Sequence, residues 1–125
     1  MAEEILVVED NRDTAQFLGL RLKSIGFQVH TEETGQAALN YAAEHRPDLV
    51  ILDIRLPDIN GYEVCKSLRR LYDLWTPPIL MLTGLNEPVD KLRGFAHGAD
   101  AYLTKPCNLA EIVKTVAFLL GEPLS

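Results

Sequence analysis

The sequence predicts an α/β fold in which five short parallel strands alternate with five helices. Apolar runs recur along the chain, and the central one, at residues 49–52, shows no polar alternation, as is typical of a strand covered on both faces. The segments between these runs carry apolar residues at helical spacing. Because strands joined by helices pair through right-handed crossovers, this order favours one parallel sheet with helices on both faces.

The N-terminal half begins with an apolar strand at residues 5–8 and a helix over residues 11–25. Apolar residues at roughly helical spacing predict the inner face of this helix: Phe17, Leu18, Leu20, Leu22 and Ile25. Gly26 ends the helix, and the alternating residues 27–31 suit a strand near the sheet edge. Thr34 can cap a second helix, which runs up to the proline before the central strand. Its apolar face holds Ala37, Ala38, Tyr41 and Ala42.

The C-terminal half continues the alternation with three helices and two strands. In chain order they are expected at residues 61–72, 79–82, 86–97, 99–104 and 108–120. The first of these helices directs Val64, Leu68 and Leu71 inward, and the second packs through Phe95. Asn108 caps the last helix. Its inner residues are Leu109, Ile112, Val113, Val116 and Leu119.

The length and charge of the chain limit its organisation and its partners. With 125 residues and a formal net charge of −6, it is expected to form one domain over residues 1–125, with a core from Glu3 to Leu120 and a tail from Gly121 to Ser125. No block of Lys or Arg occurs, so direct binding of nucleic acid or of an anionic membrane is not expected. No segment approaches the length of a membrane span, and we expect a soluble, cytoplasmic protein.

The cysteines and histidines do not indicate a metal or redox site. Cys65 and Cys107 lie far apart, without a Cys-x-x-Cys pattern or a nearby histidine. Cys65 suits the buried face of a helix. His30, His45 and His97 are scattered and are expected at the surface or in packing contacts.

Polar side chains follow four of the expected strands at their carboxyl ends. They are Glu9 and Asp10 after the first strand, Asp53 after the central strand, and Thr83 and Lys105 after the last two. In an open parallel sheet these ends share one edge, which is where ligands bind. We therefore expect three carboxylates, a hydroxyl and an ammonium in one shallow cleft.

The composition of this cleft suits a divalent cation and phosphate chemistry. Neighbouring carboxylates raise one another's pKa through repulsion, and Mg²⁺, which takes carboxylate and phosphate oxygens, relieves that repulsion. Lys105 adds a positive charge and Thr83 a hydrogen-bond donor, so an adjacent carboxylate could accept a phosphoryl group. Each side chain alone has a simpler explanation, such as a helix cap for Asp10. Their occurrence together at strand ends favours a functional site.

The chain resembles a known family in several short motifs that occur in the family's order. These motifs are Glu9-Asp10, Asp53 with Leu56-Pro57 and Gly61, Thr83-Gly84, Gly98-Ala99-Asp100 and Lys105-Pro106. They resemble those of the response-regulator receiver domains of two-component signalling, of the chemotaxis-regulator type, over the whole chain. The resemblance implies a flavodoxin-like fold with the strand order 2-1-3-4-5.

The resemblance also implies roles for the acidic residues. Asp53 matches the aspartate that accepts a phosphoryl group from a histidine kinase or a small phosphodonor. Asp10 and Asp53, together with the backbone carbonyl of Arg55, would bind Mg²⁺ directly. Glu9 would act on the ion through water. Such domains are regulatory phospho-acceptors that assist only their own phosphorylation and dephosphorylation, so no other enzyme activity is expected.

In this family phosphorylation changes one face of the domain. The resemblance implies that Thr83 and Lys105 hold the phosphoryl oxygens, and that the Lys105–Pro106 bond is cis. Tyr102 matches the switch residue whose orientation follows Thr83, and the plainer interpretation, a half-exposed strand tyrosine, is compatible with that role. The implied output is a shift in the face made by the fourth helix, the fifth strand and the fifth helix, which controls a partner or an output domain.

Two further side chains, Arg55 and Leu85, are implied to flank the approach of water to the phosphoryl group. Leu85 has no polar atom to orient an attacking water and tends to exclude one. Arg55 can cover the phosphoryl group as a charge partner. Both effects predict a long-lived phosphoaspartate; the opposing interpretation is that Arg55 stabilises the transition state for hydrolysis.

The chain departs from the family pattern at three places. Cys107 stands where phenylalanine is common, and Ala101 stands where the subfamily with winged-helix outputs has a second aspartate. The last helix has Lys114 as its only basic residue, without that subfamily's arginines, which puts the usual dimer in doubt. We expect a monomer or a weak phosphorylation-dependent dimer that meets a sensor histidine kinase or phosphotransfer protein and a downstream partner.

Three other functions compete with this interpretation. A phosphatase of the haloacid-dehalogenase class also places a nucleophilic aspartate after a buried strand, but it needs a second acid where this chain has Arg55. A flavodoxin-like cofactor binder needs a phosphate-binding loop after the first strand, where Glu9 and Asp10 would repel phosphate. A receiver-like module that binds partners without phosphorylation stays open.

Overall fold

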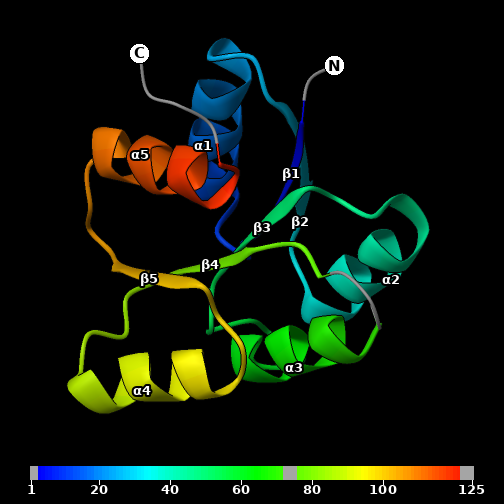
Figure 1. Ribbon diagram of the computed structural model, residues 1–125, viewed down its shortest axis with the longest axis vertical. Coiled ribbons are helices and arrows are strands. Elements are labelled where there is room, and N and C mark those ends of the chain that lie inside the picture. The colour runs from blue at the N-terminus through cyan, green and yellow to red at the C-terminus, as the bar shows by residue number, and fades with distance from the viewer. Residues whose placement is uncertain (1–2, 72–75, 122–125) are drawn as a thin grey trace.

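The computed structural model describes residues 3–71 and 76–121 and contains one parallel sheet of five strands (Figure 1). The strands are β1 (Glu4–Val8), β2 (Gln28–Glu32), β3 (Leu49–Leu52), β4 (Ile79–Thr83) and β5 (Ala101–Thr104). They pair in the order β2-β1-β3-β4-β5, and each neighbouring pair is parallel. The predicted fold class and strand order are therefore confirmed.

Helices connect the strands and cover both faces of the sheet. They are α1 (Arg12–Ser24), α2 (Gly35–His45), α3 (Gly61–Leu71), α4 (Pro88–Ala96) and α5 (Leu109–Leu119). Helices α1 and α5 lie on one face, and α2, α3 and α4 lie on the other (Figure 1). Asn11, Thr34 and Asn108 cap α1, α2 and α5, because each side chain accepts a hydrogen bond from a backbone N–H of the first turn. Among these described helices, none has the length and apolar character to span a membrane.

An apolar core lies on each side of the sheet. Because side chains alternate along a strand, the three central strands send every second residue to each face. Those facing α1 and α5 are Ile5, Val7, Leu49, Ile51, Leu80 and Leu82; those facing the other three helices are Leu6, Val8, Val50, Leu52, Ile79 and Met81. All twelve are buried, which agrees with the unbroken apolar runs in the sequence.

The prediction of inward-facing residues is wrong at five helical or helix-terminal positions. Phe17, Leu20 and Ile25 around α1, Leu71 of α3 and Phe95 of α4 are exposed. The buried stripe of α1 consists instead of Ala15, Leu18, Gly19 and Leu22. These four follow the i, i+3, i+4, i+7 spacing of one helix face, and Phe17 and Leu20 lie on the opposite side of the helix. Apolar character alone did not separate the two groups.

The boundaries of most elements differ from the prediction by one or two residues, and two of them illustrate the reasons. Strand β5 begins at Ala101 and not at Ala99, because the Ala99 N–H donates to the Gly94 carbonyl and still belongs to the turn after α4. Helix α3 is described up to Leu71, and Tyr72, its expected last residue, lies outside the described part of the chain. Neither difference moves the carboxyl ends of the strands.

Candidate functional site

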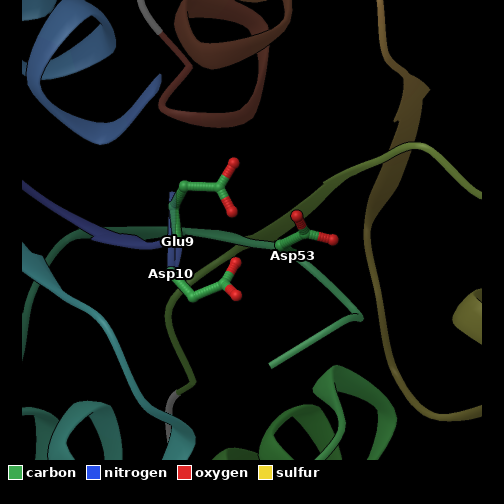
Figure 2. A group of neighbouring side chains, drawn as sticks. All are labelled: Glu9, Asp10 and Asp53. Atoms are coloured by element: carbon green, nitrogen blue, oxygen red, sulfur yellow. The ribbon is translucent and has the colours of Figure 1, made fainter. Parts of the chain in front are cut away.

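Four strand ends meet at one edge of the sheet, as expected from the sequence. Glu9 and Asp10 follow β1, Asp53 follows β3, Thr83 is the last residue of β4, and Lys105 follows β5. Figure 2 shows the three acidic side chains gathered at these ends, and one oxygen of each lies within 4.8 Å of the others. In the described part of the chain this is the group of side chains that could hold a metal ion.

The Lys105 ammonium lies between two of the three carboxylates. Its Nζ donates to Asp53 Oδ2 at 2.8 Å and also donates to Glu9 Oε1. The side chains of Glu9 and Asp53 are 5% and 10% exposed, and that of Lys105 is 28% exposed. An isolated charge at such a position would be strongly disfavoured, so the lysine is what allows the acids to be buried together.

The pKa values of the two buried acids are shifted in opposite directions. The pKa of Glu9 is raised from 4.5 to about 7, mainly because the carboxyl group is buried. The Lys105 ammonium acts to lower this pKa, and the neighbouring Asp53 carboxylate acts to raise it. Burial also acts to raise the pKa of Asp53, but hydrogen bonds from Lys105 and Glu9 outweigh it and leave that pKa below its ordinary value. Asp53 is therefore the acid that stays ionised, and Glu9 is the one that holds a proton near neutral pH.

The site has the donor set that a Mg²⁺ ion requires. Glu9 Oε2 is buried and has no hydrogen-bond partner, while Asp10 is exposed beside it. The acids line an open depression of about 390 Å³ together with Arg55 and Lys105. Mg²⁺ favours a few carboxylate oxygens and keeps several waters, which an open acidic depression permits. An unpartnered buried oxygen also suits a water molecule held by such an ion.

Thr83 and Tyr102 are connected through one residue of the loop between β4 and α4. The Leu85 N–H donates to Thr83 Oγ1 at 3.4 Å, and the Tyr102 hydroxyl donates to the Leu85 carbonyl at 2.8 Å. Thr83 is fully buried and Tyr102 is 8% exposed, so the plainer expectation of a half-exposed tyrosine is wrong for this structure. The backbone of Leu85 therefore joins the sheet edge to the tyrosine on β5.

The loop after Asp53 is held by hydrogen bonds at two places. The Gly61 N–H donates to the Ile54 carbonyl at 2.8 Å, and a Cβ at Gly61 would lie 2.4 Å from the Asp53 carbonyl oxygen, so a side chain is excluded there. Asp58 accepts hydrogen bonds from the first backbone N–H groups of α2, Gly35 at 2.8 Å and Gln36 at 2.9 Å. No local sequence pattern marks Asp58, because its partners lie more than twenty residues earlier in the chain.

The two side chains expected to flank the phosphoryl group lie in different surroundings. Arg55 is exposed in the lining of the depression, and its backbone N–H donates to Asp53 Oδ1 at 3.2 Å. Leu85 is half-buried and packs against the apolar core under α2, α3 and α4. The expected cis bond between Lys105 and Pro106 is present.

The cysteines and histidines are not among the side chains that line the acidic depression. Cys65 is buried and Cys107 is half-buried. The rings of His30 and His45 stack on Tyr41, with centroids 3.7 Å and 4.1 Å away. These contacts confirm packing roles for the two histidines.

Comparison with protein families supports the assignment that the motifs suggest. The family model described as the response regulator receiver domain matches residues 5–117. The response regulator ArlR of Staphylococcus aureus is 38% identical over 117 residues, which is 94% of this chain and 52% of that protein. The chain thus spans about half the length of the curated relatives that it matches.

Solved structures with the same fold include several response regulators. A putative response regulator from Chloroflexus aurantiacus has a TM-score of 0.91 and 36% identity, covering 98% of this chain and all of that one. The chemotaxis protein CheY4 of Vibrio cholerae has a TM-score of 0.86 and 32% identity, covering 95% of this chain and 99% of that one. The BeF₃-activated receiver domain of RstA from Klebsiella pneumoniae has a TM-score of 0.87 and 30% identity, covering 94% and 97%.

The raised pKa of Glu9 predicts how stability depends on pH in the absence of divalent ions. Between pH 4.5 and about 7 the folded protein keeps a proton on Glu9 that the unfolded chain releases, so folding is favoured at the low end of this window and less so as the pH rises. In Glu9→Gln this contribution is absent. We expect the unfolding free energy of the parent, minus that of Glu9→Gln, to fall by about 1–3 kcal/mol between pH 4.5 and 7 and then to level off.

Urea denaturation at several pH values in the presence of a chelator measures this difference. Glu44→Gln, at an exposed position of α2, is the matched control for replacing a glutamate by its amide. A parent-minus-Glu9→Gln difference that rises with pH, or stays constant, would contradict the assignment of the protonated acid to Glu9.

Proposed function

The chain belongs to the response regulator receiver domain family, and on that premise we propose that it is a phosphorylation-activated signalling switch. In this proposal Asp53 accepts a phosphoryl group from a histidine kinase or a small phosphodonor. The observation that carries the proposal is the 2.8 Å contact between Lys105 Nζ and Asp53 Oδ2 at the edge where Thr83 and two further acids also lie. An ionised nucleophile thus lies beside a cation and a hydroxyl that could hold a phosphoryl group.

The proposed reaction needs positioning and charge more than covalent chemistry from the protein. An oxygen of Asp53 attacks the phosphorus atom, the new O–P bond forms as the bond to the donor breaks, and the donor leaves with the electron pair. The lowered pKa of Asp53 keeps that oxygen unprotonated at neutral pH. Lys105 and the Thr83 hydroxyl then contact the oxygens of the transferred group.

The acids would hold the metal ion that receiver domains generally use. Asp10 and Asp53 are proposed as direct ligands with the backbone carbonyl of Arg55, and Glu9 as a ligand through water. When bound, Mg²⁺ supplies positive charge against the negative charge on the phosphoryl oxygens. The unpartnered Oε2 of Glu9 and the exposure of Asp10 support this division of roles.

The competing classes of function fit the site less well. The second acid of a haloacid-dehalogenase phosphatase is replaced by Arg55, and Glu9 with Asp10 occupies the position where a flavodoxin-like protein binds phosphate. The domain is therefore proposed to be a regulatory phospho-acceptor that assists only its own phosphorylation and dephosphorylation. A receiver-like module that is never phosphorylated would not need an ionised Asp53 beside Lys105.

Leu85 provides a physical connection for the switch. A phosphoryl group that draws the Thr83 hydroxyl toward itself would release the Leu85 N–H, and the Leu85 carbonyl is the acceptor for Tyr102. Phosphorylation is therefore proposed to shift the population of conformations over α4, β5 and α5, which controls an output partner or domain. This is a change in an existing equilibrium and not a new fold.

The setting of the switch is also part of the proposal. The receiver unit is proposed to run from Glu3 to Leu120, with Gly121–Ser125 as a tail. It acts in the cytoplasm, as a monomer or a weak phosphorylation-dependent dimer, between a sensor histidine kinase or phosphotransfer protein and a downstream partner. Family membership supports these roles, and the net charge of −6 argues against direct nucleic-acid binding by this domain.

The identity of the acceptor can be tested by substitution. We expect Asp53→Asn to abolish the mass gain of one phosphate that follows incubation with acetyl phosphate and Mg²⁺, because an amide oxygen is a poor nucleophile toward phosphorus. Intact-mass spectrometry measures the gain. Asp13→Asn, which removes an exposed acid of α1, should be phosphorylated like the parent. Phosphorylation of Asp53→Asn at another residue would reject the assignment.

The lifetime of the phosphoaspartate is predicted to depend on Arg55 and Leu85. An arginine over the phosphoryl group and a leucine without polar atoms both hinder an attacking water. We expect the double variant Arg55→Asn, Leu85→Glu to lose its phosphoryl group faster than the parent, by about fivefold, which corresponds to roughly 1 kcal/mol of activation free energy.

Intact mass, followed over time after removal of the phosphodonor at matched Mg²⁺ and pH, gives the rate of loss. The two single variants separate the contributions, since Arg55 lines the depression whereas Leu85 packs against the core. A double variant whose phosphoaspartate lasts as long as the parent's, or longer, would refute the prediction and favour stabilisation of the transition state by Arg55.

A further inference from the structure

Helix α4 packs on the sheet through a glycine, Gly94. Of its nine residues, all of them described, the buried one is Gly94. Its large apolar residues Val89, Leu92 and Phe95 are 49%, 70% and 49% exposed, so Phe95 packs inward less than the sequence predicts. A helix that buries no large side chain of its own must gain its contact with the sheet from what lies beneath it.

The side chain beneath Gly94 is Tyr102. A Cβ at Gly94 would lie 2.9 Å and 3.1 Å from the Cδ2 and Cε2 atoms of the tyrosine ring and 3.0 Å from Met81 Sδ. Non-bonded carbon atoms prefer 3.5–4.0 Å, so there is no room for a methyl group while the ring is there. Met81 is fully buried and cannot withdraw into open space. The Tyr102 ring therefore occupies the space that a side chain at position 94 would need.

The Tyr102 side chain could also adopt an orientation toward solvent, because β5 is an edge strand. Strand β5 is at the edge of the sheet, and Tyr102 is paired on one side, with Met81 of β4. Its buried orientation rests on the contact under Gly94, the hydrogen bond to the Leu85 carbonyl and a tilted contact with the Phe95 ring, whose centroid is 6.5 Å away. A ring displaced from under α4 would turn toward solvent beyond the edge of the sheet.

We propose that Gly94 is the positioning residue that admits Tyr102 to its buried orientation and so allows α4 to close over β5. Any side chain at position 94 then shifts the tyrosine outward. The consequence for signalling rests on the proposed function: phosphorylation of Asp53 would proceed without its normal effect on the α4–β5–α5 face. The steric statement itself does not require phosphorylation.

Gly19 provides a matched control for replacing a helical glycine. It is buried in α1, and a Cβ there would lie 3.6 Å from Val29 Cγ1, an ordinary van der Waals distance. Alanine is favoured over glycine inside a helix, so Gly19→Ala should raise the midpoint of thermal unfolding. Gly94→Ala gains the same helix preference but must overpack Tyr102 and Met81, so we expect its midpoint to fall by about 3 °C or more.

The direct measurement is a nuclear Overhauser effect between the Tyr102 ring and the Met81 methyl group, in protein labelled on tyrosine and methionine. We expect it in the parent and in Gly19→Ala, and we expect its loss in Gly94→Ala. In the Tyr102→Ala background, Gly94→Ala should no longer lower the unfolding midpoint, because the clashing ring is gone and the Met81 side chain can move into the space that the ring leaves. The double variant also keeps the test decisive if Gly94→Ala alone folds poorly.

Retention of the nuclear Overhauser effect between Tyr102 and Met81 in Gly94→Ala would overturn the proposal. So would a fall in the unfolding midpoint on Gly94→Ala that is equal with Tyr102 present and with Tyr102→Ala. After acetyl phosphate and Mg²⁺, the parent and Gly94→Ala should gain the same mass, but the amide shifts of β5 should change much less in the variant. Equal shift changes would overturn the role in signalling. If the parent itself gains no phosphate, the proposed function fails while the labelled-ring measurement still decides the role of Gly94.

Discussion

The contact of Lys105 with Asp53 and Glu9 is the interaction on which the site depends. Two carboxylates buried side by side repel each other, and without a cation one of them would have to leave the sheet edge or stay protonated. The lysine resolves this only in part, since the pKa of Glu9 remains raised to about 7 while that of Asp53 is lowered. The unequal division keeps Asp53 ionised, as the proposed role of phosphoryl acceptor requires, and leaves negative charge that a divalent ion could balance.

The fold supplies this contact through the geometry of parallel strands. Central strands that are buried on both faces have fixed ends, and the residues after them must emerge at one edge. The loop after Asp53 is restrained as well, because Gly61 hydrogen-bonds to Ile54 and Asp58 accepts hydrogen bonds from the start of α2. The face on the far side of the site is held differently: α4 rests on Tyr102, whose hydroxyl contacts the same loop residue as Thr83. The proposed chemistry is thus placed at the ends of buried strands, and the proposed response is placed on a helix whose large side chains are exposed.

The sequence predicts the sheet and the convergence of the polar strand ends, because both depend on local patterns of apolar runs and on which residues follow them. The strand order follows instead from the resemblance to receiver domains. Prediction from sequence fails where position on a helix face decides the outcome, as for Phe17 and Leu20, which are apolar but lie on the side of α1 opposite its buried stripe. It also cannot show contacts between segments that are distant in the chain. Asp58 with the start of α2, and Gly94 with Tyr102, are visible only when the elements are packed together.

The proposed requirement of the acidic site for a divalent ion is the claim to test first, because it follows from the clustering of Glu9, Asp10 and Asp53. The measurement is the intact mass of the unmodified protein after incubation with acetyl phosphate, once with Mg²⁺ and once with excess chelator. The account predicts a gain of one phosphate with Mg²⁺ and little or none in the chelator. No gain under either condition, or an equal gain under both, would contradict it.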